Sequence, residues 1–259
     1  MTTKNIIRFT TAFLILGNLA SCEGNLTQLE PELPPVEDSE ALKNLVDTTF
    51  SVSLPEGIVW KAGDRVAIYD GVAKRDFTIA EAGDAGAAVL NGYVSAGAEG
   101  FCAVWPYDSA PETLPSEGRV IVKVPAVQTV GNGDNADPAA MVCVGKLSDG
   151  IMSFEKAVSQ IKVNIPDGVT SVTVKGLAYE NVSGNTASVV LNPSGETFKA
   201  GEYGITVFPQ SFRTGYKVVY CKQGHLAVAK IVPSQDSGMA LEAGKTYDIT
   251  GQTAAGALV

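Results

Sequence analysis

Histidine and clustered positive charge are both scarce in this chain. Its 259 residues include one histidine, His225, and 19 Lys and Arg residues stand against 28 Asp and Glu residues, for a net charge of −9. Imidazole most often serves as the general base or metal ligand near neutral pH, so a single histidine leaves little for catalysis. No run of basic residues is long enough to neutralise a phosphate backbone. We therefore expect no enzymatic activity, no cofactor, no metal site and no nucleic-acid partner.

The chain also lacks an apolar run long enough to span a bilayer as a helix, which takes about 20 residues. Its apolar stretch Phe9–Ala20 follows Lys4 and Arg8, an arrangement typical of an export signal. The stretch ends in Leu19-Ala20-Ser21-Cys22, which resembles the lipobox of bacterial lipoproteins. That resemblance implies a signal peptide over residues 1–21 and acylation of Cys22. The alternative is an ordinary signal peptide with a chance cysteine after it.

Two or three acyl chains suffice for durable membrane attachment, because each buried methylene contributes about 0.8 kcal/mol. We therefore expect a surface-exposed lipoprotein of the cell outer membrane, held by the lipid on Cys22. Residues 22–48 should form a solvated tether, since acids and prolines dominate there. Its acids are Glu23, Glu30, Glu32, Glu37, Asp38, Glu40 and Asp47, its one basic residue is Lys43, and its prolines are Pro31, Pro34 and Pro35.

From Phe50 onward, apolar and polar residues alternate in short runs, as in strands with one buried face. In Arg119–Val124 the valines share one face, and Ile161–Ile165 repeats the pattern. Pairs such as Asp149-Gly150 and Gln223-Gly224 separate the runs, and glycine there favours hairpin turns. About seven strands are expected in the first half of the body and about eight in the second, enough for one sandwich in each.

The expected fold class is therefore all-β, with two tandem antiparallel β-sandwich domains after the signal peptide and the acidic tether. The best boundary is the polar turn at Leu147–Gly150. It divides the body into an N-terminal domain over residues 49–148 and a C-terminal domain with a tail over residues 149–259.

Three cysteines remain after lipidation of Cys22, namely Cys102, Cys143 and Cys221. An odd number in an exported protein leaves at least one thiol unpaired or bonded to another molecule. All three lie in apolar, strand-like runs, which favours buried free thiols; a bridge between Cys102 and Cys143 is the alternative. A catalytic thiol is disfavoured, because His225 follows a turn and nothing in the sequence brings it near a cysteine.

Two further features have a simple explanation and a functional alternative. The segment Thr129–Ala139 is rich in oxygen-bearing side chains but lacks the ligand spacing of a calcium loop, which favours a plain surface loop. Several aromatic side chains could line a sugar-binding platform, although their positions within alternating runs favour packing. These aromatic residues are Trp60, Tyr69, Trp105, Tyr107 and Tyr203.

Short motifs follow one another along the body: Trp60–Ile68, Gly92, Ala103–Pro106, Pro125–Gln128, Met141, Phe154–Ala157, Tyr203, Pro209 and Ala243–Tyr247. In this order, behind a lipobox and an acidic tether, they resemble the fimbrillin-like family of Bacteroidetes surface lipoproteins over nearly the whole body. The resemblance implies two transthyretin-like β-sandwich domains. It also implies a role similar to that of type V pilus subunits, which are exported as lipoproteins and polymerised or anchored at the outer membrane.

In that family, a protease removes the N-terminal segment with the first strand, and a neighbour's strand fills the gap by β-augmentation. The family's cut follows an Arg, whereas no Arg lies between Cys22 and Arg65 here. We therefore expect either a different cleavage or a retained lipid. The candidate replaceable strand is Phe50, Ser51, Val52, Ser53 and Leu54, and the candidate C-terminal donor strand is Thr246, Tyr247, Asp248, Ile249 and Thr250.

The expected function is that of a lipid-anchored cell-surface fimbrial subunit or fimbria-associated adhesin that assembles through β-strand complementation. Its expected partners are the outer membrane, through the lipid on Cys22, and other pilin-like subunits, with a host protein or glycan as a further option. The alternative function is a glycan-capturing outer-membrane lipoprotein.

Overall fold

The computed structural model describes residues 44–82, 87–116, 119–131, 133–176, 188–212, 215–231 and 239–249. All of them belong to one compact unit, residues 40–259. Within these ranges the regular structure consists of strands and two short 3-10 turns, η2 (Tyr107–Ser109) and η3 (Pro138–Ala140), which confirms the all-β prediction. No helix of the described part is long and apolar enough to cross a membrane. The predicted signal peptide, Cys22 and most of the tether lie outside these ranges.

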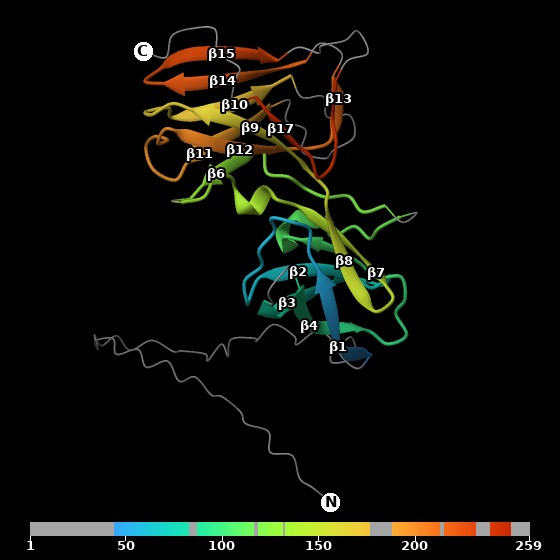
Figure 1. The fold of residues 1–259 in the computed structure, drawn as a ribbon. Helices are drawn as coiled ribbons and strands as arrows, with labels where there is room; N and C mark the ends of the chain where they lie inside the picture. Colours follow the sequence, from blue (N-terminus) through green and yellow to red (C-terminus); the bar gives the residue numbers. More distant parts are fainter. Residues whose placement is uncertain are drawn as a thin grey trace, which may run out of the picture. The chain divides into compact units, whose positions relative to one another are not determined.

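The first sheet is a closed barrel in the order β1-β4-β3-β2-β5-β7-β8 (Figure 1). It closes because β1 pairs with β4 on one side and with β8 on the other. Alternate side chains fill its interior, among them Phe50, Phe77, Leu90 and Phe154. Its strands are β1 (Leu45–Ser53), β2 (Arg65–Tyr69), β3 (Lys74–Ala82), β4 (Ala87–Ser95), β5 (Cys102–Trp105), β7 (Cys143–Ser148) and β8 (Ile151–Lys156).

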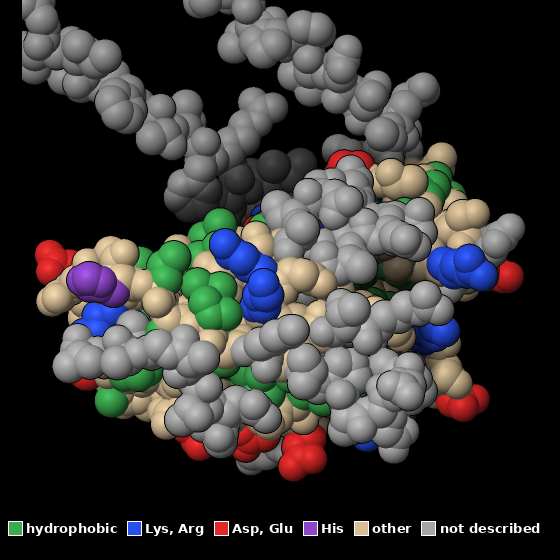
Figure 2. Space-filling view, turned by 90° about the horizontal axis from the view of Figure 1, so that it is seen from above, with side chains coloured by type: hydrophobic (Ala, Val, Ile, Leu, Met, Phe, Trp, Pro, Cys, Tyr) green, Lys and Arg blue, Asp and Glu red, His purple; other side chains and the backbone are tan. Residues whose placement is uncertain are grey.

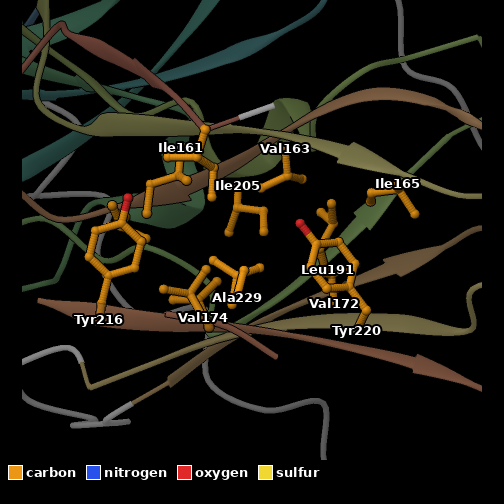
Figure 3. Close-up of a cluster of buried hydrophobic side chains, with 14 of the residues drawn as sticks. Ile161, Val163, Ile165, Val172, Val174, Leu191, Ile205, Tyr216, Tyr220 and Ala229 are labelled. Atoms are coloured by element: carbon orange, nitrogen blue, oxygen red, sulfur yellow. The ribbon is translucent and has the colours of Figure 1, made fainter. Parts of the chain in front are cut away.

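Three further sheets follow the orders β15-β14-β10-β11-β6, β12-β9-β17 and β13-β16. Apolar side chains of the five-stranded and three-stranded sheets form one core, and Figure 3 shows Ile161 and Ile205 on one side of it and Val174 and Tyr216 on the other. This is the sandwich-like packing that was expected. The strands are β6 (Val127–Val130), β9 (Ser159–Ile165), β10 (Ser171–Lys175), β11 (Ser188–Pro193), β12 (Gly201–Val207), β13 (Gln210–Phe212), β14 (Tyr216–Lys222), β15 (His225–Ile231), β16 (Met239–Leu241) and β17 (Thr246–Asp248).

Two hairpin turns lie where the glycine pairs predict them. Asp149-Gly150 joins β7 to β8 with φ of 53° and 80°, and Gln223-Gly224 joins β14 to β15 with φ of 48° and 82°. Positive φ at both central residues matches the twist of the flanking strands. His225 is the first residue of β15, so it is a hairpin residue, as the sequence predicts.

Among the described residues, the strands pair in antiparallel fashion, as expected, except for three parallel pairs: β1 with β8, β6 with β11, and β17 with β9. β6 lies between barrel strands β5 and β7 in the chain but pairs in the five-stranded sheet, while β8 lies beyond residue 149 and pairs in the barrel. β1 begins at Leu45, before the expected domain start at residue 49. The hydrogen-bonded sheets thus do not divide at residues 148 and 149, and the domain boundaries stay predictions.

The strand predicted at Arg119–Val124 is absent. Arg119 forms an isolated bridge with Ser116, and the residues after it join no ladder. Its three valines nevertheless share a face and pack on the small cluster that contains Tyr69. Alternation marks an extended chain with one buried side, whether or not a neighbouring strand is present. The prediction that the three valines share one buried face was right, and the prediction of a strand was wrong.

Candidate functional site

β1 contains four of the five residues of the candidate replaceable strand, Phe50–Ser53, and it lies between two partner strands. It pairs with β4 along its whole length, from Leu45 opposite Ser95 to Ser53 opposite Ala87. On its other side, Ser51–Ser53 pair in parallel with the first three residues of β8. The last three residues of β1 are therefore paired on both sides, and they close the barrel.

The side chains of this strand alternate between the barrel interior and solvent. Phe50 and Val52 are 6% and 4% exposed, whereas Ser51 and Ser53 are exposed. The Phe50 ring lies 5.5 Å from that of Phe77 and 5.3 Å from that of Phe101, centroid to centroid. Leu54 packs on the same cluster. Removing β1 would therefore leave an apolar groove between two strands with unpaired backbone groups.

The candidate donor strand lies in another sheet. Thr246–Asp248 form β17, the outer strand beside β9, and Thr250 is outside the described residues. Ile249 is 8% exposed, and it packs with the half-buried Tyr247 in the core of the sandwich-like sheets rather than in the barrel. The two candidate strands are therefore not brought together within one molecule. Cys22, the predicted lipidation site, also lies outside the described residues.

The aromatic residues considered for a sugar platform are mostly buried. Trp60, Tyr69 and Trp105 are 3%, 1% and 7% exposed, and the rings of the two tryptophans lie 5.7 Å apart. Burial raises the pKa of Tyr69 to about 12, and its hydroxyl donates to the Pro111 carbonyl at 2.6 Å. The Tyr107 ring has the guanidinium of Arg65 at 4.0 Å and the ammonium of Lys74 at 4.1 Å. These contacts favour packing roles.

All three remaining cysteines are free thiols, so the alternative Cys102–Cys143 bridge is not present. Cys143 is buried, and this burial raises its pKa to about 12. Burial also raises the pKa of the half-buried Cys102. A thiol with a raised pKa is protonated at neutral pH and is a poor nucleophile.

The loop after β6 uses its carboxylate to hold its own backbone. Asp137 accepts hydrogen bonds from the backbone N–H of Thr129 at 2.8 Å and of Ala139 at 2.9 Å, and it thereby caps η3. Across the part of the chain that the structure describes, no group of three or more His, Cys, Asp or Glu side chains is placed to hold a metal ion. The plain-loop interpretation rests on the use of the Asp137 carboxylate by the loop's own backbone.

No protein-family model and no curated protein matches this chain. It is similar to the crystal structure of a candidate cell adhesion protein from Bacteroides ovatus, with 13% identity over 81% of this chain and 95% of that chain and a TM-score of 0.49. It is also similar to the tip fimbrial protein Mfa3 from Porphyromonas gingivalis with a C-terminal truncation, with 9% identity over 74% of this chain and 83% of that chain and a TM-score of 0.31. Both TM-scores are too low to assign a function, and the proposed function rests on the residues of this chain.

Proposed function

We propose that this protein is a lipid-anchored cell-surface fimbrial subunit or fimbria-associated adhesin that assembles by β-strand complementation. The observation that carries the proposal is the place of β1. This strand closes the barrel and contributes Phe50 and Val52 to its interior. Its loss would expose a groove that an alternating apolar strand from another molecule can fill, while the backbone pairs with β4 and β8.

The sequence supports the surface location through the lipobox that ends at Cys22. The acidic tether after Cys22 would keep the body away from the lipid headgroups, and no chemistry is required of the body. The proposed partners are further copies or related pilin-like subunits.

Strand replacement can be tested with the full chain carrying Cys22→Ala and a protease recognition sequence inserted in the exposed turn at Glu56–Gly57. Cleavage there leaves β1 held only by non-covalent contacts. A labelled peptide with the sequence of Leu45–Leu54 should then exchange into the cleaved chain and not into the uncut chain. The cleaved chain should also form oligomer ladders on unheated gels once free β1 is washed out.

The matched control is the same peptide with Phe50→Ser and Val52→Ser, which keeps the backbone donors but loses the interior contacts. It should not exchange. If the cleaved chain takes up neither peptide and stays monomeric after the loss of β1, strand complementation at this barrel is excluded.

The glycan-capturing alternative has less support. It needs exposed aromatic faces, and three of the aromatic residues considered for it are buried. Tyr203 is only partly buried, but its hydroxyl donates to the Lys199 carbonyl at 2.9 Å and its ring packs edge-on against Phe198 at 5.0 Å. No observation on the described residues favours a sugar platform over these packing roles.

A further inference from the structure

The five-stranded sheet gathers positive charge that is dispersed in the sequence. The strands β6, β10, β11, β14 and β15 contain no Asp or Glu. The chain as a whole has 28 acids against 19 bases. The basic residues of these strands are Lys175, Lys217, Lys222, His225 and Lys230.

Three of these lysines occupy one row across neighbouring strands. Lys175 pairs with Lys217, and Lys217 pairs with Lys230. Lys175 and Lys217 are exposed, and none of the ion pairs seen among the described residues includes either of them. Like charges directly opposite each other destabilise a sheet. A row of this kind is therefore expected to meet negative charge from a partner.

A row of mainly apolar residues runs beside Lys175 and Lys217 on the same outer face. Its registered positions are Val127, Val190, Thr173, Val219 and Val228, one from each of the five strands. Val127 is 59% exposed and the nearby Leu226 is 66% exposed. Figure 2 shows hydrophobic side chains beside Lys and Arg side chains on the surface in view.

The solvated face of such a sheet is ordinarily polar. Val127 is exposed here, and Val190, Val219 and Val228 are half-buried. Valines that are not fully buried beside a lysine row point to a contact surface. We name it the lysine–valine face, defined by the lysine row Lys175, Lys217 and Lys230 together with the row Val127, Val190, Thr173, Val219 and Val228.

The occupant has to supply both carboxylates and apolar groups, which favours a polypeptide over an anionic polysaccharide. The chain contains such a segment: residues 23–40 hold six acids and no Lys or Arg, interspersed with apolar residues. The acids are Glu23, Glu30, Glu32, Glu37, Asp38 and Glu40, and the apolar residues include Leu26, Leu29, Leu33 and Val36.

We propose that the lysine–valine face binds the acidic segment, residues 23–40, of a second copy of this chain. The inference rests on the proposed function in that lipid anchoring would hold copies on one surface and raise their effective concentration. It uses a different sheet from strand complementation in the barrel. The contact would link the tether of one subunit to the body of its neighbour.

The test uses the full chain with Cys22→Ala in two complementary variants, followed by sedimentation velocity. One variant, Lys175→Glu with Lys217→Glu, has an altered face and an intact segment. The other, with Glu30→Gln, Glu32→Gln and Glu37→Gln, has an intact face and an altered segment. Each alone should self-associate about tenfold more weakly than the parent, because several surface charge pairs are lost. Their mixture should regain association, since one supplies the face and the other the segment.

Recovery in the mixture also shows that neither variant has simply failed to fold. The matched control is Lys61→Glu with Lys146→Glu, which makes the same change in net charge at two exposed lysines elsewhere and should leave association unchanged. Equal weakening in this control, or no recovery in the mixture, overturns the proposal; the latter result would assign the segment to its own chain.

Heparin serves as the polysaccharide probe. The proposal is also overturned if the face variant loses heparin binding while self-association persists.

A failure of this proposal can be distinguished from a failure of the proposed function. Peptide exchange at β1 can succeed while the complementary variants fail to associate, which removes only the lysine–valine contact. The variants can also associate while no peptide exchanges, which removes strand complementation alone.

Discussion

Gly145 lies directly beneath an aromatic ring in the barrel. It pairs with Phe154 across β7 and β8, and a Cβ at Gly145 would lie 2.8 Å from Cζ of that ring. The ring is held edge-on against Trp60, with centroids 4.9 Å apart. Because the core is close-packed, the ring has little room to retreat.

We therefore expect Gly145→Ala to lower the free energy of unfolding by about 1–3 kcal/mol, the usual cost of overpacking. The measurement is urea denaturation followed by tryptophan fluorescence. Gly195→Ala is the matched control, since nothing lies within 4 Å of the position that its added methyl group would occupy, and it should change stability by less than about 0.5 kcal/mol. Equal midpoints for Gly145→Ala and the parent chain would show that the ring moves aside freely.

The carboxylate of Asp70 is buried and accepts several hydrogen bonds. It is 1% exposed and accepts from Arg75 Nε at 2.7 Å and from the backbone N–H of Ser95, Ala73 and Val72 at 2.8, 2.8 and 2.9 Å. Burial alone would raise the Asp70 pKa, but the hydrogen bonds from Arg75 and these three backbone groups outweigh it and lower the pKa well below its ordinary value.

The lowered pKa of Asp70 predicts a pH-dependent contribution to stability. The unfolded pKa is about 3.9, so the contribution is complete above that pH and is lost as the pH falls toward the folded pKa. Asp70→Asn should therefore cost more stability near pH 7 than near pH 3, as measured by urea denaturation at both. Asp76→Asn, at an exposed pair with Arg65, should show little change at either pH. A cost for Asp70→Asn that is the same at both pH values would contradict the argument.

At the scale of elements, the outer edge of β12 is covered by the segment that contains β6 and the loop after it. The amide of Gln128 is fully buried; its Nε2 donates to the Thr206 carbonyl at 2.6 Å, and its Oε1 accepts from the Thr206 N–H at 3.0 Å. Two residues earlier on β12, the Gly204 N–H donates to the Asn135 carbonyl at 2.6 Å. These contacts occupy the positions where another strand would pair, so this edge is protected from intermolecular pairing.

Gln128→Ala should uncover part of that edge. It leaves the Thr206 N–H and C=O without partners, which we expect to cost about 2–3 kcal/mol and to speed hydrogen exchange of the Thr206 amide. The matched control is Gln160→Ala, whose Nε2 contacts the Met141 sulfur at 3.9 Å and whose loss should cost less than about 1 kcal/mol. An unchanged rate of hydrogen exchange at the Thr206 amide in Gln128→Ala would mean that the hydrogen bonds from Gln128 do not protect β12.

At the scale of the whole molecule, the proposed anchor depends on one atom, the sulfur of Cys22. Cys22→Ala should move the protein from the membrane fraction to the soluble fraction, because acyl chains provide the attachment. Cys221→Ala removes a half-buried free thiol and should leave the protein with the membranes. Both are measured by cell fractionation and immunoblotting. Complete membrane retention of Cys22→Ala would remove lipid anchoring from the proposed function.

The sequence by itself determined the properties that depend on near neighbours along the chain. Alternation predicted the all-β class and the buried face of segments such as Ile161–Ile165, because side chains of an extended chain point to opposite sides in turn. Gly150 and Gly224 predicted two hairpins, because those turns require positive φ. The first seven strands, β1 to β7, matched the expected number, whereas ten described strands follow, two more than the eight expected, since three-residue strands such as β13 and β17 carry no clear periodicity.

Only the tertiary structure decided which distant segments meet. The parallel pairing of β1 with β8, the place of β6 beside β11 and the burial of Trp60 and Trp105 depend on contacts between residues far apart in the chain. No basic cluster is visible in the sequence, yet the register of β10, β14 and β15 brings Lys175, Lys217 and Lys230 into one row. Periodicity specifies the face on which a side chain lies; the partner strand and its register are selected by packing and backbone hydrogen bonds across the whole fold.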